Sequence, residues 1–345
     1  MRHAPLLSPP LVAYALALLL LSATPAYAAP SPVGLAKGWQ VADTGLHLGG
    51  YGTQDLTKET GGPWRFTTED LSLFSNWNAT SRIRVFSELS LEDVLIAQSG
   101  AGVRTDAAAL AFERLYIDYR TSEQLTARVG RFLTPVGHWN QIHADPLVWT
   151  TSRPIVTDIP FPTYATGGMI YGTVGSFPRQ IDYSLYGGNG DDTPGSPGKN
   201  PYDRLYGARL SYAFGNSKIG FSYAHFAQEI PLVEQNDLLG IDWRWSRGGY
   251  AVSSEAIYRF SSLGRSQDAR GAFLQGVAPL STRLFGVARY EYFCQGSALP
   301  AVHLWVAGLA LRVTRTSVLK AEYAWARHNS VGAETGFLSS FGILF

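Results

Sequence analysis

The sequence predicts an all-β fold whose strands each have one apolar and one polar face. Only 16% of the 345 residues are charged, whereas 13% are aromatic and 36 are glycine. Apolar and polar residues alternate with a period of two, as in residues 82–92, 180–185, 239–245 and 319–325. Successive side chains of a strand point to opposite sides, so this period is typical of a strand between two unlike environments. The composition excludes a coiled coil, a disordered tail and a helical membrane bundle.

Residues 1–28 are expected to be a cleaved signal peptide. Arg2 and His3 form a short cationic start, residues 11–21 are apolar, and Ala26-Tyr27-Ala28 has the small residues of a signal-peptidase site. The apolar run is shorter than the about 20 residues of a membrane-spanning helix, so a membrane anchor is the less favoured alternative. Residues 29–345 are left as one domain, with 27 basic and 27 acidic residues.

Sixteen strand-like segments follow, and their connections alternate between short and long. The segments are 45–53, 67–77, 81–93, 108–120, 123–132, 165–175, 179–188, 203–214, 217–227, 236–246, 249–260, 268–278, 282–293, 302–313, 317–328 and 337–345. Short turns at one end and long loops at the other are typical of a transmembrane barrel. Fourteen or eighteen strands are the alternatives to sixteen.

Bulky aromatic residues lie near the ends of the apolar faces, where a barrel would meet the two surfaces of a bilayer. They include Trp77, Trp243, Tyr290, Trp305 and Trp325. A soluble sandwich also alternates, so three features decide between the two: this placement of aromatics, the charges of both signs on the polar faces, and the terminal segment 337–345. The fold class we predict is a transmembrane antiparallel β-barrel of about 16 strands, an up-and-down meander embedded in outer-membrane lipid.

The polar faces would line a lumen, and 16 strands leave room for an aqueous channel. Passive diffusion of small hydrophilic solutes or ions is therefore the expected function. The basic residues predicted to face the lumen are Arg82, Arg84, Arg114, Arg128, Arg209, Arg244, Arg259, Arg289, Arg312 and Lys320. The acidic ones are Asp70, Glu88, Glu92, Asp118, Asp182, Asp242, Glu255, Glu291 and Glu322. Because these sets nearly balance, any ion selectivity must come from local segregation of charge.

Four arginines are candidates for such a segregated wall. Arg82, Arg84, Arg114 and Arg128 fall on three consecutive predicted strands. A ladder of arginines would favour anions or phosphate. The alternative is that they pair with carboxylates such as Glu88 and Asp118 and only solvate the lumen, and the sequence leaves both open.

The connection 133–163 is the longest, and we expect it to fold into the lumen after the fifth strand. It holds five prolines and two tryptophans, and long loops of this kind are usually functional. Its candidate constriction residues are His138, Trp139, Asn140, His143, Asp145 and Arg153. An external loop packed over the barrel mouth or at a subunit contact is the alternative.

The residues Arg128-Val129-Gly130-Arg131-Phe132-Leu133-Thr134-Pro135-Val136-Gly137 resemble a strand-end motif of the bacterial phosphate-selective porin O and P family. The alternating segment 337–345, which ends in Phe345, resembles the assembly signal of bacterial outer-membrane barrels. These resemblances imply a sixteen-stranded homotrimeric channel of the bacterial outer membrane whose third loop enters the lumen. One departure is that the family's selective members line the pore with lysine and arginine arrays, whereas this chain has five lysines.

Other functional classes find little support. A net charge of +1 gives no reason to expect nucleic acid as a partner. With one cysteine and no paired-histidine motif, we expect no cofactor, no metal site and no enzyme. The alternative function is a closed or plugged barrel that serves as a scaffold, an adhesin or a partner-binding protein.

Overall fold

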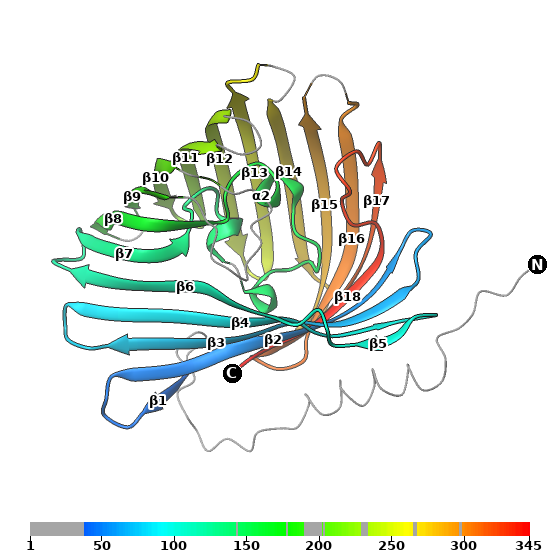
Figure 1. The fold of residues 1–345 in the computed structure, drawn as a ribbon, viewed down its shortest axis with the longest axis horizontal. Coiled ribbons are helices and arrows are strands. Elements are labelled where there is room, and N and C mark those ends of the chain that lie inside the picture. Colours follow the sequence, from blue (N-terminus) through cyan, green and yellow to red (C-terminus); the bar gives the residue numbers. More distant parts are fainter. Residues whose placement is uncertain are drawn as a thin grey trace, which may run out of the picture.

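The computed structural model describes residues 38–142, 144–176, 179–189, 202, 204–228, 234–264, 268–296 and 299–345. Within these residues the chain forms one closed β-barrel (Figure 1). Two of its eighteen strands, β1 (Trp39–Val41) and β5 (Gly102–Arg104), are three-residue additions paired to β2 and β4. The other sixteen strands make the wall. The predicted signal peptide and His143 lie outside the described residues.

The wall strands run in chain order around the barrel. They are β2 (Leu46–Glu59), β3 (Trp64–Asn78), β4 (Ile83–Gln98), β6 (Ala109–Arg120), β7 (Thr126–Leu133), β8 (Tyr164–Ser176), β9 (Arg179–Asn189), β10 (Arg204–Phe214), β11 (Ser217–Gln228), β12 (Glu234–Arg247), β13 (Tyr250–Ser261), β14 (Ala269–Pro279), β15 (Leu284–Gln295), β16 (Val302–Arg312), β17 (Ser317–Arg327) and β18 (Gly336–Leu344). Each overlaps one predicted segment, so the count of sixteen and the up-and-down order are confirmed.

The barrel closes where the last strand meets the first. β18 pairs antiparallel with β2 from Gly336 opposite Glu59 to Leu344 opposite Tyr51. Beyond the strand, the backbone N–H of Phe345 donates to the carbonyl of Gly50 at 2.9 Å, and the Gly50 N–H donates back at 2.8 Å. Closure leaves no unpaired sheet edge, which is the condition for a sheet to exist in lipid.

The two faces of the wall differ as the alternation predicts. On β6, Leu110, Ile117 and Tyr119 point outward and are about half exposed, whereas Tyr116 and Asp118 point inward and are buried. Exposed apolar side chains also occur on β3, β4 and β7–β17, so most of the outer surface is an apolar belt. Among the described residues, no helix combines the length and apolarity that a membrane crossing would require.

The first wall strands depart from the prediction by being longer and bulged. β2 extends to Glu59 and β3 begins at Trp64, so their connection is short where a long loop was expected. The strand register shifts at Glu69 on β3 and again at Glu113 on β6. A bulge places an extra residue in one strand and changes which side chains face inward.

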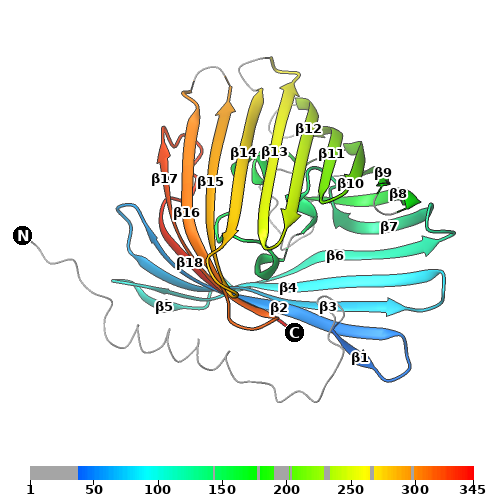
Figure 2. The same ribbon diagram turned by 180° about the vertical axis from the view of Figure 1, so that it is seen from behind.

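The segment 134–163, between β7 and β8, lies on the inner side of the wall (Figures 1 and 2). It contains the 3₁₀ turns η1 (Trp139–Gln141) and η2 (Asp145–Leu147) and the helical turn α2 (Ile155–Asp158). α2 lies against β13, β14 and β15. Val136, Ile155 and Val156 are buried in the main apolar cluster together with Phe273 and Phe293 of the opposite wall. The segment is therefore packed against the barrel interior, and we call it the inner loop.

Candidate functional site

The inner loop is fixed to the opposite wall first by Glu255 of β13. The backbone N–H groups of His138 and Trp139 both donate to Oε1 of Glu255, at 2.8 and 2.6 Å. The N–H of Gly137 donates to Ser222 of β11 at 3.2 Å. A carboxylate that accepts backbone N–H groups away from water forms strong, charge-assisted hydrogen bonds. Glu255 thus holds the start of the loop across the lumen.

Two further carboxylates hold the second half of the inner loop. The N–H groups of Thr151 and Ser152 donate to the two oxygens of Glu322 on β17, at 2.9 and 2.8 Å. The N–H of Ile155 donates to Glu291 on β15 at 2.7 Å. Irregular backbone has unsatisfied N–H groups, and burying it requires such acceptors. The wall supplies them as inward-facing glutamates.

A lysine fixes the turn between these anchors. Nζ of Lys320 on β17 lies 2.8 Å from Oδ1 of Asp145 and donates to the carbonyl of Thr150 at 3.0 Å. Burial raises the pKa of Asp145, and the nearby Lys320 charge acts in the opposite direction. Lys320 itself is almost completely buried, so its charge depends on these acceptors.

These contacts change the role of five residues that were predicted to line an open lumen. Glu255, Arg289, Glu291, Lys320 and Glu322 all face inward, but the inner loop covers them and all five are buried. Arg289 donates to the carbonyl of Ser152 at 2.9 Å. Alternation alone identifies the inner face correctly, yet it carries no information about what packs against that face.

Arg114 of β6 and Arg128 of β7 are paired rather than free. Arg128 bonds both carboxylate oxygens of Asp118, at 2.7 and 3.0 Å, and its guanidinium lies 3.6 Å from the ring centre of Tyr116. Arg114 forms an ion pair with Glu88, which is fully buried. The alternative interpretation from the sequence, charge pairing across strands, therefore describes these two arginines.

The other two arginines of the expected wall behave differently. Arg84 faces inward and donates from Nε to Asn76 at 2.8 Å. Arg82 is not on the strand: it is exposed in the turn before β4, whose first residue is Ile83. The Thr80 hydroxyl accepts the backbone N–H groups of Arg82 and Ile83, and this turn delays the start of the strand. A continuous wall of four arginines is thus absent from the described residues.

Arg209 of β10 and Arg244 of β12 both lie on the polar face of the wall. Arg209 is buried and bonds both oxygens of Asp242, at 2.6 and 2.8 Å. Nη1 of Arg244 lies 3.1 Å from Nε2 of His138 on the inner loop. Burial, and then the charge of Arg244, lower the pKa of His138 to about 4. A neutral His138 can accept the Arg244 hydrogen bond at neutral pH.

The remaining predicted loop residues mainly shape the loop itself. Trp139 packs edge-on against Phe273, with ring centres 6.1 Å apart. The side-chain amide of Asn140 donates to the carbonyl of Thr134 at 2.8 Å, and its oxygen accepts from Arg153 at 2.8 Å. Arg153 nevertheless lines a cavity between the loop and the wall.

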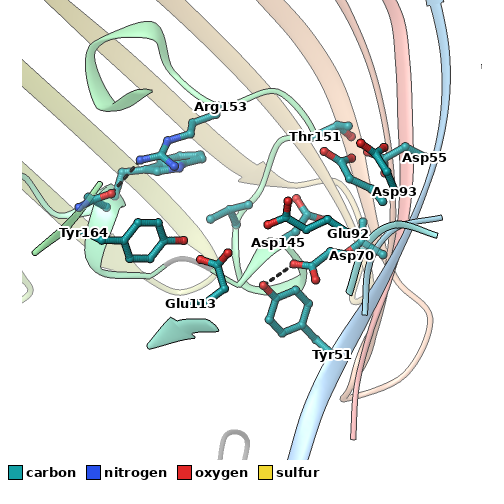
Figure 3. A pocket seen from close by; sticks show the side chains of 15 residues that line it. Tyr51, Asp55, Asp70, Glu92, Asp93, Glu113, Asp145, Thr151, Arg153 and Tyr164 are labelled. Carbon is teal, nitrogen blue, oxygen red and sulfur yellow. Dashed lines mark hydrogen bonds between the residues drawn. The ribbon is translucent and has the colours of Figure 1, made fainter. Parts of the chain in front are cut away.

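Several cavities lie between the described parts of the inner loop and the wall. The first, of about 330 Å³, lies toward β2, β3, β4 and β6, and we call it the acidic cavity (Figure 3). Its lining carboxylates are Asp55, Glu69, Asp70, Glu92, Asp93, Glu113 and Asp145. The second, of about 350 Å³, is the arginine cavity, and its charged lining residues are Arg114, Arg128, Arg209, Lys218 and Asp182. The third, of about 560 Å³, lies toward β11–β14.

The sequence interpretation missed Asp55, Glu69, Asp93 and Glu113 of the acidic cavity. A visible signal existed for the last three, since Glu69-Asp70, Glu92-Asp93 and Glu113-Arg114 are adjacent charged pairs inside strands. In a regular strand one member of each pair would face lipid. The register shifts relieve this conflict, and both residues of the first two pairs line the same cavity. Adjacent charges in a predicted barrel strand therefore indicate a bulge.

The described residues include no group of three histidine, cysteine or acidic side chains arranged to hold a metal ion.

No protein-family model and no curated protein matches the chain. Among solved structures, it is similar to OmpF of Salmonella typhi in complex with daunomycin, at 9% identity and TM-score 0.63, over 89% of this chain and 99% of that one. It is also similar to the anion-selective porin from Comamonas acidovorans, at 14% identity and TM-score 0.57, over 87% and 98%. The outer membrane channel DcaP of Acinetobacter baumannii matches at 10% identity and TM-score 0.59, over 89% and 99%. The chain thus has the fold of these porins, while its resemblance to the O and P family stays a prediction.

Proposed function

We propose that this chain is an outer-membrane channel for the passive diffusion of small hydrophilic solutes or ions. The observation that carries the proposal is the inner loop, which is fixed to the far wall of a sixteen-stranded barrel and leaves charged cavities against the near wall. The porin and channel named among its structural neighbours support it. A scaffold barrel would not need a polar inner surface of this kind.

The physical role of the loop would be to set the size of the passage. A barrel of this strand number encloses more space than its own side chains fill. By packing its apolar side against β13–β15, the loop occupies one half of the interior and turns Asp145, Asn140 and Arg153 toward the other half. Solutes would then pass between the inner loop and β2–β9.

The expected location and assembly follow from the same reasoning. The apolar outer belt would face outer-membrane lipid after export, with residues 1–28 removed as a signal peptide. We propose a homotrimer, and one of the similar structures is described as a trimer form of an outer membrane protein. Chemical cross-linking of the folded protein tests the trimer, and amino-terminal sequencing of the exported protein tests cleavage before Ala29.

An anion or phosphate preference is the narrower form of this proposal. It is supported by the arginine cavity, where Arg114, Arg128, Arg209 and Lys218 meet. Each of these cations is paired with a carboxylate, so a passing anion would compete with that partner. The sign of the reversal potential in a salt gradient decides whether anions are favoured.

The direct test is conductance of the refolded protein in a planar lipid bilayer. Stable, ohmic steps support a diffusion channel. A folded protein that inserts without conductance would favour the plugged-barrel alternative, a scaffold, adhesin or partner-binding protein. We propose no catalytic role.

A further inference from the structure

The acidic cavity has an uncompensated negative wall. Asp55, Glu69, Asp70 and Glu92 line it, and none of the four forms an ion pair within the part of the chain that the structure describes. The cation that lines the cavity, Arg153, already donates to Asn140 and Thr157 of the inner loop. Four carboxylates thus face one space with little positive charge to balance them.

Hydrogen bonds from three hydroxyl groups fix the orientation of the Asp70 carboxylate. Its Oδ2 accepts the hydroxyl of Tyr51 at 2.6 Å, and its Oδ1 accepts the hydroxyls of Ser72, at 2.9 Å, and Ser90. Figure 3 shows Asp70 and Glu92 turned toward the same space as Asp145 of the inner loop. Hydroxyl donors orient this carboxylate without neutralising it.

Two carboxylates of the cavity lie directly opposite each other in the sheet. Asp70 of β3 and Glu92 of β4 are partners in the strand register. Like charges directly opposite each other on neighbouring strands repel unless they share a proton or a cation lies between them. A bound cation would therefore relieve the repulsion between Asp70 and Glu92.

A separate observation indicates that the cavity is incomplete without a ligand. Thr53 lies between Tyr51 and Asp55 on β2, is 3% exposed, and lines the cavity. Its hydroxyl oxygen has no hydrogen-bond partner in the described structure, and neither does Oδ1 of the buried Asp55. Buried polar atoms in proteins are nearly always hydrogen-bonded. Both atoms can accept an N–H group from a molecule in the cavity.

The lining selects an organic cation over a metal ion. No trio of acidic side chains among the described residues has metal-binding geometry, whereas the aromatic rings of Tyr51, Trp139 and Tyr164 line the same space. Carboxylates combined with aromatic faces suit an ammonium group on a short carbon chain. A volume of about 330 Å³ accommodates a solute of small-molecule size.

We propose that the acidic cavity is a binding subsite for solutes that carry a primary ammonium group, so that the channel favours small organic amines. This inference rests on the proposed channel function, because it places the subsite beside the path of diffusing solutes. The ammonium would lie between Asp70 and Glu92, with the hydroxyl of Thr53, the register partner of Asp70 on β2, as a further acceptor.

The test compares two probes of equal length, 1,5-diaminopentane and the neutral 1,5-pentanediol, added to single channels in a bilayer. The diamine is expected to interrupt the ion current at concentrations where the diol has no effect. Asp70→Asn and Glu92→Gln should each raise the half-blocking concentration about tenfold or more, because each removes one charge in contact with the ammonium. Asp70→Glu, which keeps the charge, should retain most of the block.

Asp182→Asn is the matched control, since Asp182 is an inward-facing carboxylate of the arginine cavity that pairs with Lys218. It should leave the diamine block within about twofold of the unaltered channel. Equal effects of diamine and diol, or a block that survives Asp70→Asn and Glu92→Gln, would overturn the subsite.

Calorimetric titration of the detergent-folded protein with the diamine separates this inference from the proposed function. Binding that Asp70→Asn abolishes, in a protein that does not conduct, would support the subsite and contradict the channel. Conductance without diamine binding would support the channel and contradict the subsite. Heat-dependent gel mobility verifies that each variant has folded before it is compared.

Discussion

Gly137 and Glu255 fit together so closely that a β-carbon on Gly137 would lie 2.0 Å from Oε2 of Glu255. Gly137 has φ +64°, a conformation that residues with a β-carbon rarely adopt. Position 137, the last of the sequence motif 128–137, thus requires glycine for a specific physical reason. It lets the inner loop approach the carboxylate that accepts its backbone N–H groups.

Replacing this glycine is expected to loosen the inner loop. Gly137→Ala adds the backbone penalty of about 1 kcal/mol and a direct clash with Glu255, so the loop should leave its anchor. We expect noisier single-channel current and faster proteolysis within residues 134–163. Gly61→Ala is the control, because Gly61 also has positive φ, +80°, but has open space around its β-carbon position. Equal behaviour of the two variants would contradict the anchor.

The ion pair of the buried Lys320 and the partly exposed Asp145 gives a second test of the anchored loop. Lys320→Met leaves Asp145 without its cation and should destabilise the folded protein by about 1–3 kcal/mol, less than for a fully buried pair because solvent reaches Asp145. The double variant Lys320→Met with Asp145→Asn should recover much of this loss, because no unpaired charge remains. Urea unfolding of the unaltered protein, Lys320→Met, Asp145→Asn and the double variant measures the coupling free energy between the two side chains. Additive losses would show that the two side chains do not interact.

The fold could be predicted because its signal is local. A period of two is visible within a single strand, as in Ile83, Val85 and Leu89 of β4, and repeating it along the chain gives the number of strands. The structure confirms the sixteen wall strands. The error at β2 and β3 also has a local cause, because the extra residue at Glu69 interrupts the alternation on which the boundaries depended.

The site was less accessible because its contacts join distant parts of the chain. His138 and Glu255 are 117 residues apart in the sequence, and Ser152 and Glu322 are 170 apart. Alternation shows that Glu255 faces inward, but a free lumen charge and an acceptor for loop N–H groups have the same sequence pattern. Only the folded chain distinguishes Glu255, which is buried beneath the inner loop, from Glu92, which stays partly exposed at the acidic cavity.

The ion pair of Arg128 and Asp118 predicts a strongly non-additive mutant cycle. Arg128→Ala leaves Asp118 buried beside the hydroxyl of Tyr171, which lies 3.0 Å away, and should lower stability by about 3–5 kcal/mol. It should also shift the reversal potential toward cations, since one positive charge is lost. The double variant Arg128→Ala with Asp118→Ala restores charge balance and should return the reversal potential close to its original value. A double variant that remains as shifted as Arg128→Ala would contradict pairing at the arginine cavity.

Glu334, in the loop between β17 and β18, should make the stability of the folded protein depend on pH. Burial, and then the charges of Glu69, Glu322, Glu59 and Asp158, together raise the pKa of Glu334 from 4.5 to about 7. Because the folded protein favours the protonated form, this stabilisation is fully present below about pH 4.5 and is lost as the pH rises through about 7. The thermal midpoint of the unaltered protein should therefore fall between pH 5 and pH 8 by more than that of Glu334→Gln. Glu334 is exposed to solvent, so screening keeps the difference small, and the comparison needs both proteins in the same detergent and salt. An identical fall in the two proteins would place the pH dependence elsewhere in the barrel.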